Sequence, residues 1–206
     1  RTIVETKQIS KAVIKRLPRY YRYLGELMED NVERISSNEL SKKMHTTASQ
    51  IRQDFSCFGE FGQQGYGYNV EELRSEIGHI LGVDNDHHLI MIGVGNLGRA
   101  LLNNFPFENT GFTVDASFDV SPDVIDTQIN GIPVYSTDEL ESYIKRHAVD
   151  VVVLTIPQAV AQATANRLID LGILGFWNFT NVELSSPNPD VQFENIHFAD
   201  SLLTLS

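Results

Sequence analysis

The sequence predicts an α/β fold in which a parallel, helix-covered sheet follows a smaller, mainly helical N-terminal domain. Three observations support this prediction. Leu89 begins an apolar run that ends in closely spaced glycines and then an apolar helix. Strand-like and helix-like segments alternate from there to the C-terminus, which is typical of a parallel sheet. Two short capped helical segments and a glycine-rich stretch precede that region.

The N-terminal segment from Lys11 to Leu27 repeats apolar residues at three- and four-residue steps, which predicts a helix. Pro18 predicts a break or a helix start within it. Ser36 followed by Glu39 forms a capping-box pattern, and Thr47 repeats the cap before a helix through Ile51 and Phe55. Two short helices joined by a few residues are typical of a helix-turn-helix.

The second of these helices carries polar residues away from its apolar face. Arginine fits guanine and glutamine fits adenine in the major groove of DNA. We therefore expect phosphate contacts from Arg16, Arg19, Lys42 and Lys43, and base contacts from Ser49, Gln50, Arg52 and Gln53. The alternative is a solvated polar face.

The stretch from Phe58 to Val70 alternates glycines with aromatic residues and predicts a β-hairpin. A hairpin after a helix-turn-helix makes a winged helix. Its tip, formed by Gln63, Gln64, Gly65 and Tyr66, is predicted to reach DNA. The single cysteine, Cys57, is interpreted as a packing residue.

A helix over residues 70–81 and a linker over residues 82–88 follow, so the predicted domains are 1–84, 85–196 and a C-terminal segment 197–206. His87 and His88 are interpreted as linker residues, because nothing near them completes a metal-ligand spacing. No metal site is expected.

Gly93, Gly95 and Gly98 have the G-x-G-x-x-G spacing of a dinucleotide-binding turn. The first glycine permits a tight turn, the second lets the backbone approach a pyrophosphate, and the third lets the helix pack closely. The expected phosphate loop is therefore Gly93, Val94, Gly95, Asn96, Leu97 and Gly98. An ordinary strand-to-helix turn is the alternative.

The next strand ends at Asp119, about twenty residues past the last glycine, where an acid binds the adenine ribose. Asp119 and the neighbouring Val120 are therefore predicted to bind the cofactor. The acidic side chain of Asp119 predicts NAD(H) rather than NADP(H), because it would repel a 2′-phosphate. The alternative is a surface acid that ends a strand.

Further elements are expected as strands at 131–135, 149–156, 173–179 and 191–196, and as helices from Ser136, over 159–171 and over 198–205. Ligands of a Rossmann-type sheet bind at the carboxyl ends of its strands. Thr155, Ile156 and Pro157 are thus predicted beside the cofactor. Asn178 is predicted to hydrogen-bond its nicotinamide or ribose, and Phe179 to wall the pocket. Simple strand endings are the alternative.

The chain has 206 residues, 42% of them hydrophobic, and no apolar run of membrane-spanning length. One cysteine excludes an internal disulfide and predicts the cytoplasm. Residues 1–69 have a net charge of +3 and residues 70–206 of −14, so only the N-terminal part is expected to bind a polyanion.

No acid/base residue and no substrate domain accompany the cofactor signature, which favours sensing over catalysis.

These features together resemble the Rex family of bacterial redox-sensing transcriptional repressors. The motifs that support the resemblance are RLPRYYRYL at 16–24, ISSNEL at 35–40, QIRQDFS at 50–56, FGEF at 58–61, GYNV at 67–70, GVGNLG at 93–98, GIPV at 131–134 and Asn178-Phe179.

The resemblance implies a homodimer that binds a palindromic operator and represses genes of fermentation and NADH reoxidation. It implies release by NADH as well, whereas NAD⁺ does not release the repressor or favours binding. It also implies a C-terminal helix exchanged between subunits. The chain departs from the family at His197, where an aspartate is usual, and at Phe105, where a tyrosine is common.

An apolar pocket of Phe105, Phe107, Phe179 and Phe198 is predicted to favour the uncharged reduced nicotinamide, because burying the positive oxidised ring is costly. NADH would then close the dimer and misalign its two recognition helices. Two other functions stay open: a small NAD-dependent oxidoreductase, and a nucleotide-gated regulatory module such as a CoA-binding domain.

Overall fold

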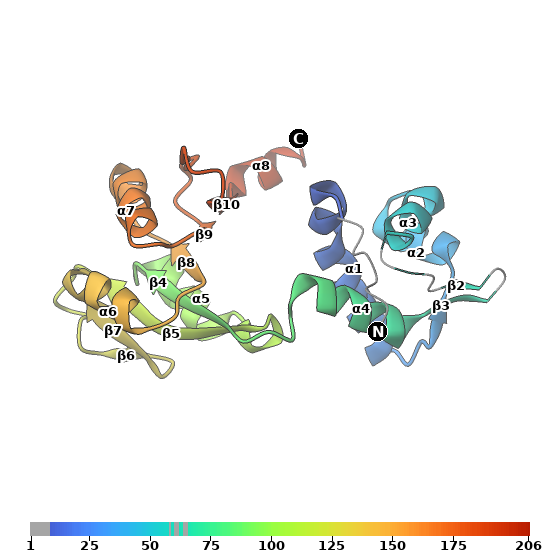
Figure 1. The fold of residues 1–206 in the computed structure, drawn as a ribbon, viewed down its shortest axis with the longest axis horizontal. Coiled ribbons are helices and arrows are strands. Elements are labelled where there is room, and N and C mark those ends of the chain that lie inside the picture. The colour runs from blue at the N-terminus through green and yellow to red at the C-terminus, as the bar shows by residue number, and fades with distance from the viewer. Residues whose placement is uncertain (1–8, 58, 60–61, 64–65) are drawn as a thin grey trace, which may run out of the picture. The chain divides into compact units, whose positions relative to one another are not determined.

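The structure is a computed structural model that describes residues 9–57, 59, 62–63 and 66–206. The chain divides into two compact units, one ending at Asp84 and the other beginning at Asn85. Each has its own core, because buried apolar side chains form one cluster in the N-terminal unit and two in the C-terminal unit. Figure 1 shows the elements of both units. No helix in the described part of the chain has the length and apolar character needed to span a bilayer.

The N-terminal unit is built on α1 (Lys11–Glu29), which packs against α4 (Val70–Leu81). The expected break at Pro18 is wrong, because α1 runs through it without interruption. Pro18 lies on the exposed side of the helix, whereas Leu17, Tyr20 and Leu24 are buried. Packing of that apolar face outweighs the hydrogen bond that the proline removes.

The helix-turn-helix is formed by α2 (Ser37–Met44) and α3 (Ala48–Phe55). A three-stranded antiparallel sheet completes the unit, with β1 (Arg34–Ile35) beside β3 (Gly67–Asn69) and β3 beside β2 (Gly62–Gln63). The hairpin of β2 and β3 confirms the predicted wing, whereas β1 was not predicted. Two-residue strands such as β1 are too short to produce a periodic pattern.

The C-terminal unit contains a seven-stranded sheet in the order β10-β9-β8-β4-β5-β7-β6. Its strands are β4 (His87–Ile92), β5 (Phe112–Asp119), β6 (Gln128–Ile129), β7 (Ile132–Ser136), β8 (Val151–Leu154), β9 (Gly175–Asn178) and β10 (Gln192–Asn195). All pairings are parallel except that of β6 with β7. Chain order reverses between β4 and β8, which is the switch point where ligands bind in such sheets.

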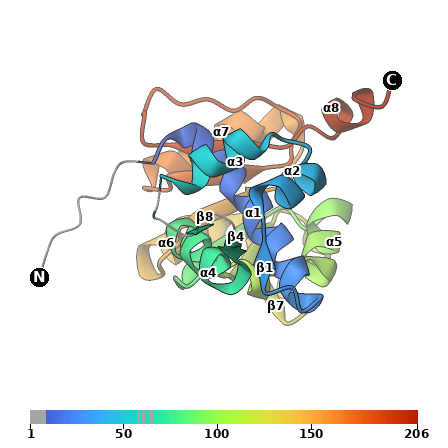
Figure 2. The ribbon, with the colours of Figure 1, turned by 90° about the vertical axis from the view of Figure 1, so that its right-hand side faces the viewer.

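Helices cover both faces of this sheet. One face packs against α6 (Leu140–Arg146) and α7 (Gln158–Asp170), and the other against α5 (Asn96–Asn104). Short 3₁₀ turns precede β5 (Phe107–Asn109) and α6 (Thr137–Glu139). The last helix, α8 (Phe198–Leu203), projects from the rest of this unit beside the C-terminus (Figure 2).

The predicted linker is wrong at its end, because His87 and His88 belong to β4. His88 Nδ1 lies 2.7 Å from Asp115 Oδ2 on β5, and the His88 backbone N–H donates to Asp150 Oδ2. This contact with Asp115 raises the pKa of His88. Polar residues at the start of a strand interrupt its apolar pattern, so the sequence placed the strand two residues too late.

Candidate cofactor and DNA-binding sites

The turn from β4 to α5 depends on two glycines. Gly93 has a φ of +96°, and a Cβ atom there would lie 2.7 Å from the Thr155 carbonyl oxygen. A Cβ atom on Gly98 would lie 2.2 Å from the Gly93 carbonyl oxygen. These are the tight turn and the close helix packing that the sequence predicts.

Gly95 differs from both, because a Cβ atom there would have no described neighbour within 4 Å. It is the N-cap of α5 and provides no side-chain cap, so within the described chain the first N–H groups of the helix receive none. Open space beside uncapped N–H groups and a positive helix end suits a phosphate group. The residues fit the pyrophosphate that the sequence predicts.

Asp119 lies at the carboxyl end of β5 and holds the phosphate loop. Its Oδ2 atom accepts a hydrogen bond from the Val94 N–H at 2.8 Å, and its Oδ1 atom accepts one from the Ser121 N–H at 2.8 Å. Each carboxylate oxygen has a further lone pair for a ribose hydroxyl. The acid is therefore oriented by backbone groups before any ligand arrives.

A cavity of about 750 Å³ opens above these residues. The predicted residues that line it are Gly93, Gly95, Asp119, Val120, Thr155, Ile156 and Pro157. The sequence did not predict the lining from Thr137, Leu140, Val160, Thr164 and Arg167. Val160, Thr164 and Arg167 are spaced so that they share one face of α7. The sequence shows that shared face but does not show that it is the one turned toward the cavity.

The predicted role of Asn178 is wrong. Its side chain is buried, and its amide nitrogen donates to the Val182 carbonyl oxygen and to Asn195 Oδ1, each at 2.7 Å. Its amide oxygen accepts hydrogen bonds from the backbone and hydroxyl of Thr180. Side chains alternate between faces along a strand, and this one points into the protein, where its bonding capacity is used.

Phe105 does not line the cofactor cavity. It lies in a second, apolar cavity of about 430 Å³ with Phe107 and Trp177. The ring centroids are 5.3 Å apart for Phe105 and Trp177, 4.7 Å for Trp177 and Phe179, and 6.1 Å for Phe179 and Phe198. The four predicted phenylalanines thus belong to one series of ring contacts, in which Trp177 is the member that the sequence did not reveal.

Among the described residues that line the cofactor cavity, the ionisable side chains are Asp119 and Arg167. His147 stacks on Tyr143, and His197 contacts Glu183. Cys57 belongs to the N-terminal unit and packs against its core. The described part of the chain contains no group of three histidine, cysteine or acidic residues arranged for a metal ion.

In the N-terminal unit, both predicted caps are confirmed. Ser36 Oγ accepts from the Glu39 N–H while Glu39 accepts from the Ser36 N–H, and Thr47 Oγ1 accepts from the Gln50 N–H. His45 ends α2 in the left-handed conformation, with a φ of 52°. These local signals fix where each helix begins and therefore which residues α3 exposes.

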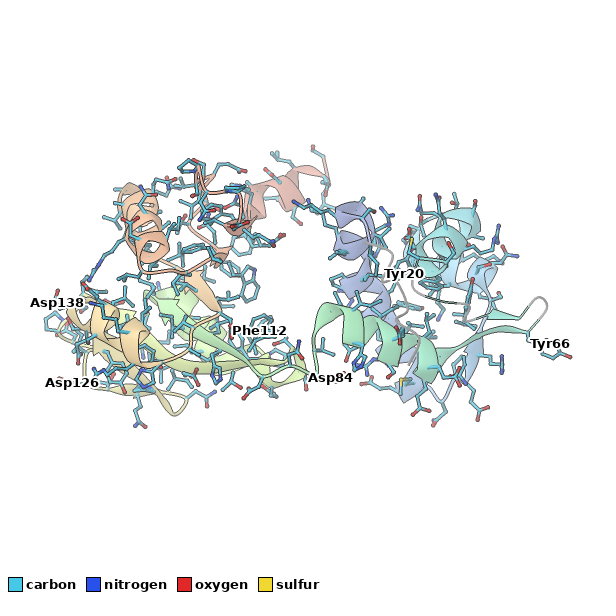
Figure 3. The ribbon with its side chains drawn as sticks, viewed as in Figure 1. Tyr20, Tyr66, Asp84, Phe112, Asp126 and Asp138 are labelled. Carbon is cyan, nitrogen blue, oxygen red and sulfur yellow. The ribbon has the colours of Figure 1, made fainter. Side chains whose placement is uncertain are left out.

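Arg16 and Gln50, two predicted DNA contacts, are each bonded to the buried carboxylate of Asp54, although the Arg16 side chain is 39% exposed. Arg16 donates to both carboxylate oxygens of Asp54 at 2.7 and 2.8 Å, Tyr20 donates to Asp54 at 2.8 Å, and Gln50 donates at 2.9 Å. Figure 3 shows Tyr20 inside this unit. Burial raises the pKa of Asp54, but the bonds from Arg16, Tyr20 and Gln50 outweigh it and lower the pKa below its usual value.

The other predicted DNA contacts are exposed. They are Arg19, Lys42, Lys43, Ser49, Arg52 and Gln53. Arg52 donates to Ser37 Oγ, and the Lys43 ammonium lies 5.3 Å from the Tyr23 ring centroid. Tyr66 is 70% exposed at the hairpin (Figure 3). Gln64 and Gly65 lie outside the described residues, as does the side chain of Gln63.

Comparison with known proteins identifies both units. Residues 8–56 match the family model for the N-terminus of putative DNA-binding proteins, and residues 84–182 match the CoA-binding domain. The redox-sensing transcriptional repressor Rex of Clostridium botulinum strain Hall is 51% identical over 200 residues, covering 97% of this chain and 95% of that protein. The chain belongs to the Rex family. Its relatives are repressors, which agrees with the expectation that it is not an enzyme.

Solved structures of a Rex-family repressor, RSP, share the whole fold. Its complex with NAD⁺ and operator DNA has a TM-score of 0.88 and 49% identity, covering all of this chain and 92% of that one. Its complex with NADH has a TM-score of 0.88 and 46% identity, covering all of this chain and 93% of that one. The Rex assignment confirms the predicted family and the predicted two-part fold.

Proposed function

We propose that this protein is a DNA-binding repressor that senses the NADH/NAD⁺ ratio, as the Rex family does. The observation that best supports this is the pairing of a helix-turn-helix unit with a dinucleotide site that lacks catalytic side chains among its described lining. The Rex relatives are redox-sensing transcriptional repressors. RSP has been solved in one complex with NAD⁺ and operator DNA and in another with NADH. Genes of fermentation and NADH reoxidation are its proposed targets.

The proposed cofactor position follows from the phosphate loop. The pyrophosphate lies against the N-terminus of α5, beside Gly95, Asn96 and Leu97, and Asp119 accepts from the adenine ribose. The negative charge of Asp119 repels the 2′-phosphate of NADP(H), which favours NAD(H). Thr155, Ile156 and Pro157 form the wall where the dinucleotide crosses β8.

The proposed DNA contacts are the exposed residues of α2 and α3. Lys42 and Lys43, with Arg19 of α1, bind phosphates, while Ser49, Arg52 and Gln53 face the major groove. Arg16 and Gln50 have a different role, because Asp54 holds both. Arg16 of α1 fixes α3 against α1 and so orients the recognition helix, whereas Gln50 lies on α3 itself and bonds Asp54 within one helical turn. Tyr66 and the hairpin tip approach the backbone or minor groove.

A palindromic operator requires a protein with two-fold symmetry. The apolar residues of α8 support a homodimer, since Phe198 is 53% exposed, Leu202 70% and Leu203 66%. Apolar side chains that are exposed together on one helix mark a surface that packs against another protein surface. We assign that surface to a second copy of the chain, with residues 197–206 exchanged between subunits. None of the four phenylalanines is among the described residues that line the cofactor cavity, so their preference for the uncharged reduced nicotinamide stays a prediction.

Fluorescence anisotropy of a labelled palindromic duplex tests this function. The purified protein is titrated onto the duplex at fixed salt, and NADH or NAD⁺ is then added. We expect release by NADH at concentrations at which NAD⁺ has no effect. Equal responses to both nucleotides would contradict redox sensing, DNA binding indifferent to both would make the cofactor site irrelevant, and turnover of a hydroxy or carbonyl substrate would favour an oxidoreductase.

A further inference from the structure

A series of hydrogen bonds begins at the carboxyl end of β9. Asn178, which is 1% exposed, donates from its amide nitrogen to Asn195 Oδ1 at 2.7 Å. Asn195 is the last residue of β10 and pairs with Asn178 in the sheet register. The two asparagines therefore join the ends of neighbouring parallel strands through side chains as well as through the backbone.

The series continues to the base of α8. Asn195 Nδ2 lies 3.4 Å from Glu183 Oε1, and Glu183 Oε2 lies 3.1 Å from His197 Nε2. His197 is the residue immediately before α8. Its side chain is 29% exposed, whereas that of Glu183 is 77% exposed, so removal of Glu183 leaves no cavity in the core.

Two contacts run parallel to this series. The Ile196 N–H donates to the Asn178 carbonyl oxygen at 2.8 Å, and the ring of Phe179 lies 6.1 Å from that of Phe198. Residues 178–179 thus contact residues 195–198 by backbone, polar and aromatic groups. The first turn of α8 is held by these contacts, whereas the exposed residues of its later part extend beyond them.

The same strand ends adjoin the cofactor cavity. Leu154 pairs with Asn178, and the Phe179 N–H donates to the Leu154 carbonyl oxygen at 2.9 Å. Thr155 follows Leu154 and lines the cavity beside the glycines. A shift of the β8–α7 turn on cofactor binding would reach the β9 end through these bonds, which is the coupling that the experiment below measures.

We propose that Glu183 and His197 are positioning residues that fix the direction of α8 relative to the carboxyl edge of the sheet. Through Asn195 and Asn178 they couple that direction to the cofactor cavity. This inference rests on the proposed function, in which α8 joins two copies of the chain and NADH alters DNA binding. Neither residue touches the cofactor or DNA in this proposal.

Hydrogen–deuterium exchange of the whole 206-residue chain tests the positioning directly, without DNA or nucleotide. Glu183→Ala removes the bonds to both His197 and Asn195, and Glu183→Gln retains an acceptor. We expect exchange at residues 198–203 to rise at least about fivefold in Glu183→Ala and to be near wild type in Glu183→Gln. Exchange in α7 stays unchanged. Asp190→Asn, an exposed acid of the same unit, is the charge control.

A second measurement tests the coupling. NADH affinity is taken from the fluorescence of the bound reduced cofactor, and coupling from the ratio of DNA affinities with and without NADH. Glu183→Ala is expected to lower that ratio by roughly fivefold or more while NADH affinity stays within about twofold. Unchanged α8 exchange, an unchanged ratio, or an equal fall in NADH affinity would overturn the proposal. If wild-type protein shows no NADH effect on DNA, the proposed function fails, whereas the exchange result still decides whether Glu183 positions α8.

Discussion

The candidate DNA-binding site and the candidate cofactor site depend on different chemical groups. The first depends on side chains and the second mainly on the backbone. In the N-terminal unit, the buried carboxylate of Asp54 gathers Arg16, Tyr20 and Gln50 and thereby orients α3. In the C-terminal unit, the phosphate loop depends on backbone groups and on missing side chains at Gly93 and Gly98. The first site is therefore sensitive to the loss of a polar group, and the second to the addition of a carbon atom.

The largest effect tests the backbone-built site. Gly98→Ala places a Cβ atom 2.2 Å from the Gly93 carbonyl oxygen, so the loop or α5 must move. We expect about 4 kcal/mol of destabilisation of the C-terminal unit and loss of NADH binding. Thermal unfolding and cofactor fluorescence measure both. Wild-type stability in this variant would show that the loop does not require its glycine.

The next effect tests the side-chain-built site. Asp54→Ala leaves the Tyr20 hydroxyl buried without its partner and releases Arg16 and Gln50. We expect the free energy of unfolding of the N-terminal unit to fall by about 3 kcal/mol, with weaker DNA binding and unchanged NADH binding. Glu29→Ala, an exposed acid of α1, is the control.

The same network predicts an acid response. The pKa of Asp54 is lowered in the folded state, so its contribution is present above the unfolded pKa and is lost as the pH falls through the folded value. Asp54→Asn should therefore flatten the stability of this unit against pH on the acid side. An unchanged acid profile would place the titrating group elsewhere.

A smaller effect is expected at the cofactor ribose. Asp119→Asn keeps an acceptor but removes the charge, and should weaken NADH binding by about tenfold, or ~1.4 kcal/mol. Binding of NADPH should improve in the same variant, because the repulsion of its 2′-phosphate is gone. Asp123→Asn, an exposed acid on the following turn, should change neither affinity.

The smallest expected effect is a pH dependence of stability in the C-terminal unit that is opposite in sign to that of Asp54 in the N-terminal unit. Asp115 raises the pKa of His88, so the contribution of this pair is complete below the unfolded pKa and is lost as the pH rises through the folded value. His88→Gln should remove this alkaline-side loss from the unfolding curve of the C-terminal unit. Persistence of the loss in the variant would mean that another group titrates.

The predictability of the molecule follows the same division. Glycine spacing, helix caps and apolar periodicity specify backbone geometry, so the phosphate loop, Asp119, both short helices and the wing were predictable from local patterns. The bonding of Arg16 and Asn178 was not, because Arg16 depends on a partner 38 residues away and Asn178 on which face a strand end presents. The bond between Gln50 and Asp54 joins residues four apart on one helix, so a signal for it was available in the sequence. Pro18 was misjudged because tertiary packing outweighs its local preference.

The most direct test of the central claim uses Gly95→Ala, in which the added Cβ atom has no described neighbour within 4 Å but occupies the space assigned to the pyrophosphate. DNA release by NADH is measured by anisotropy for this variant and wild type side by side. We expect both to fold and to bind the duplex equally, with NADH releasing only the wild type. Release of the variant at the wild-type NADH concentration would contradict the claim that the dinucleotide site controls DNA binding.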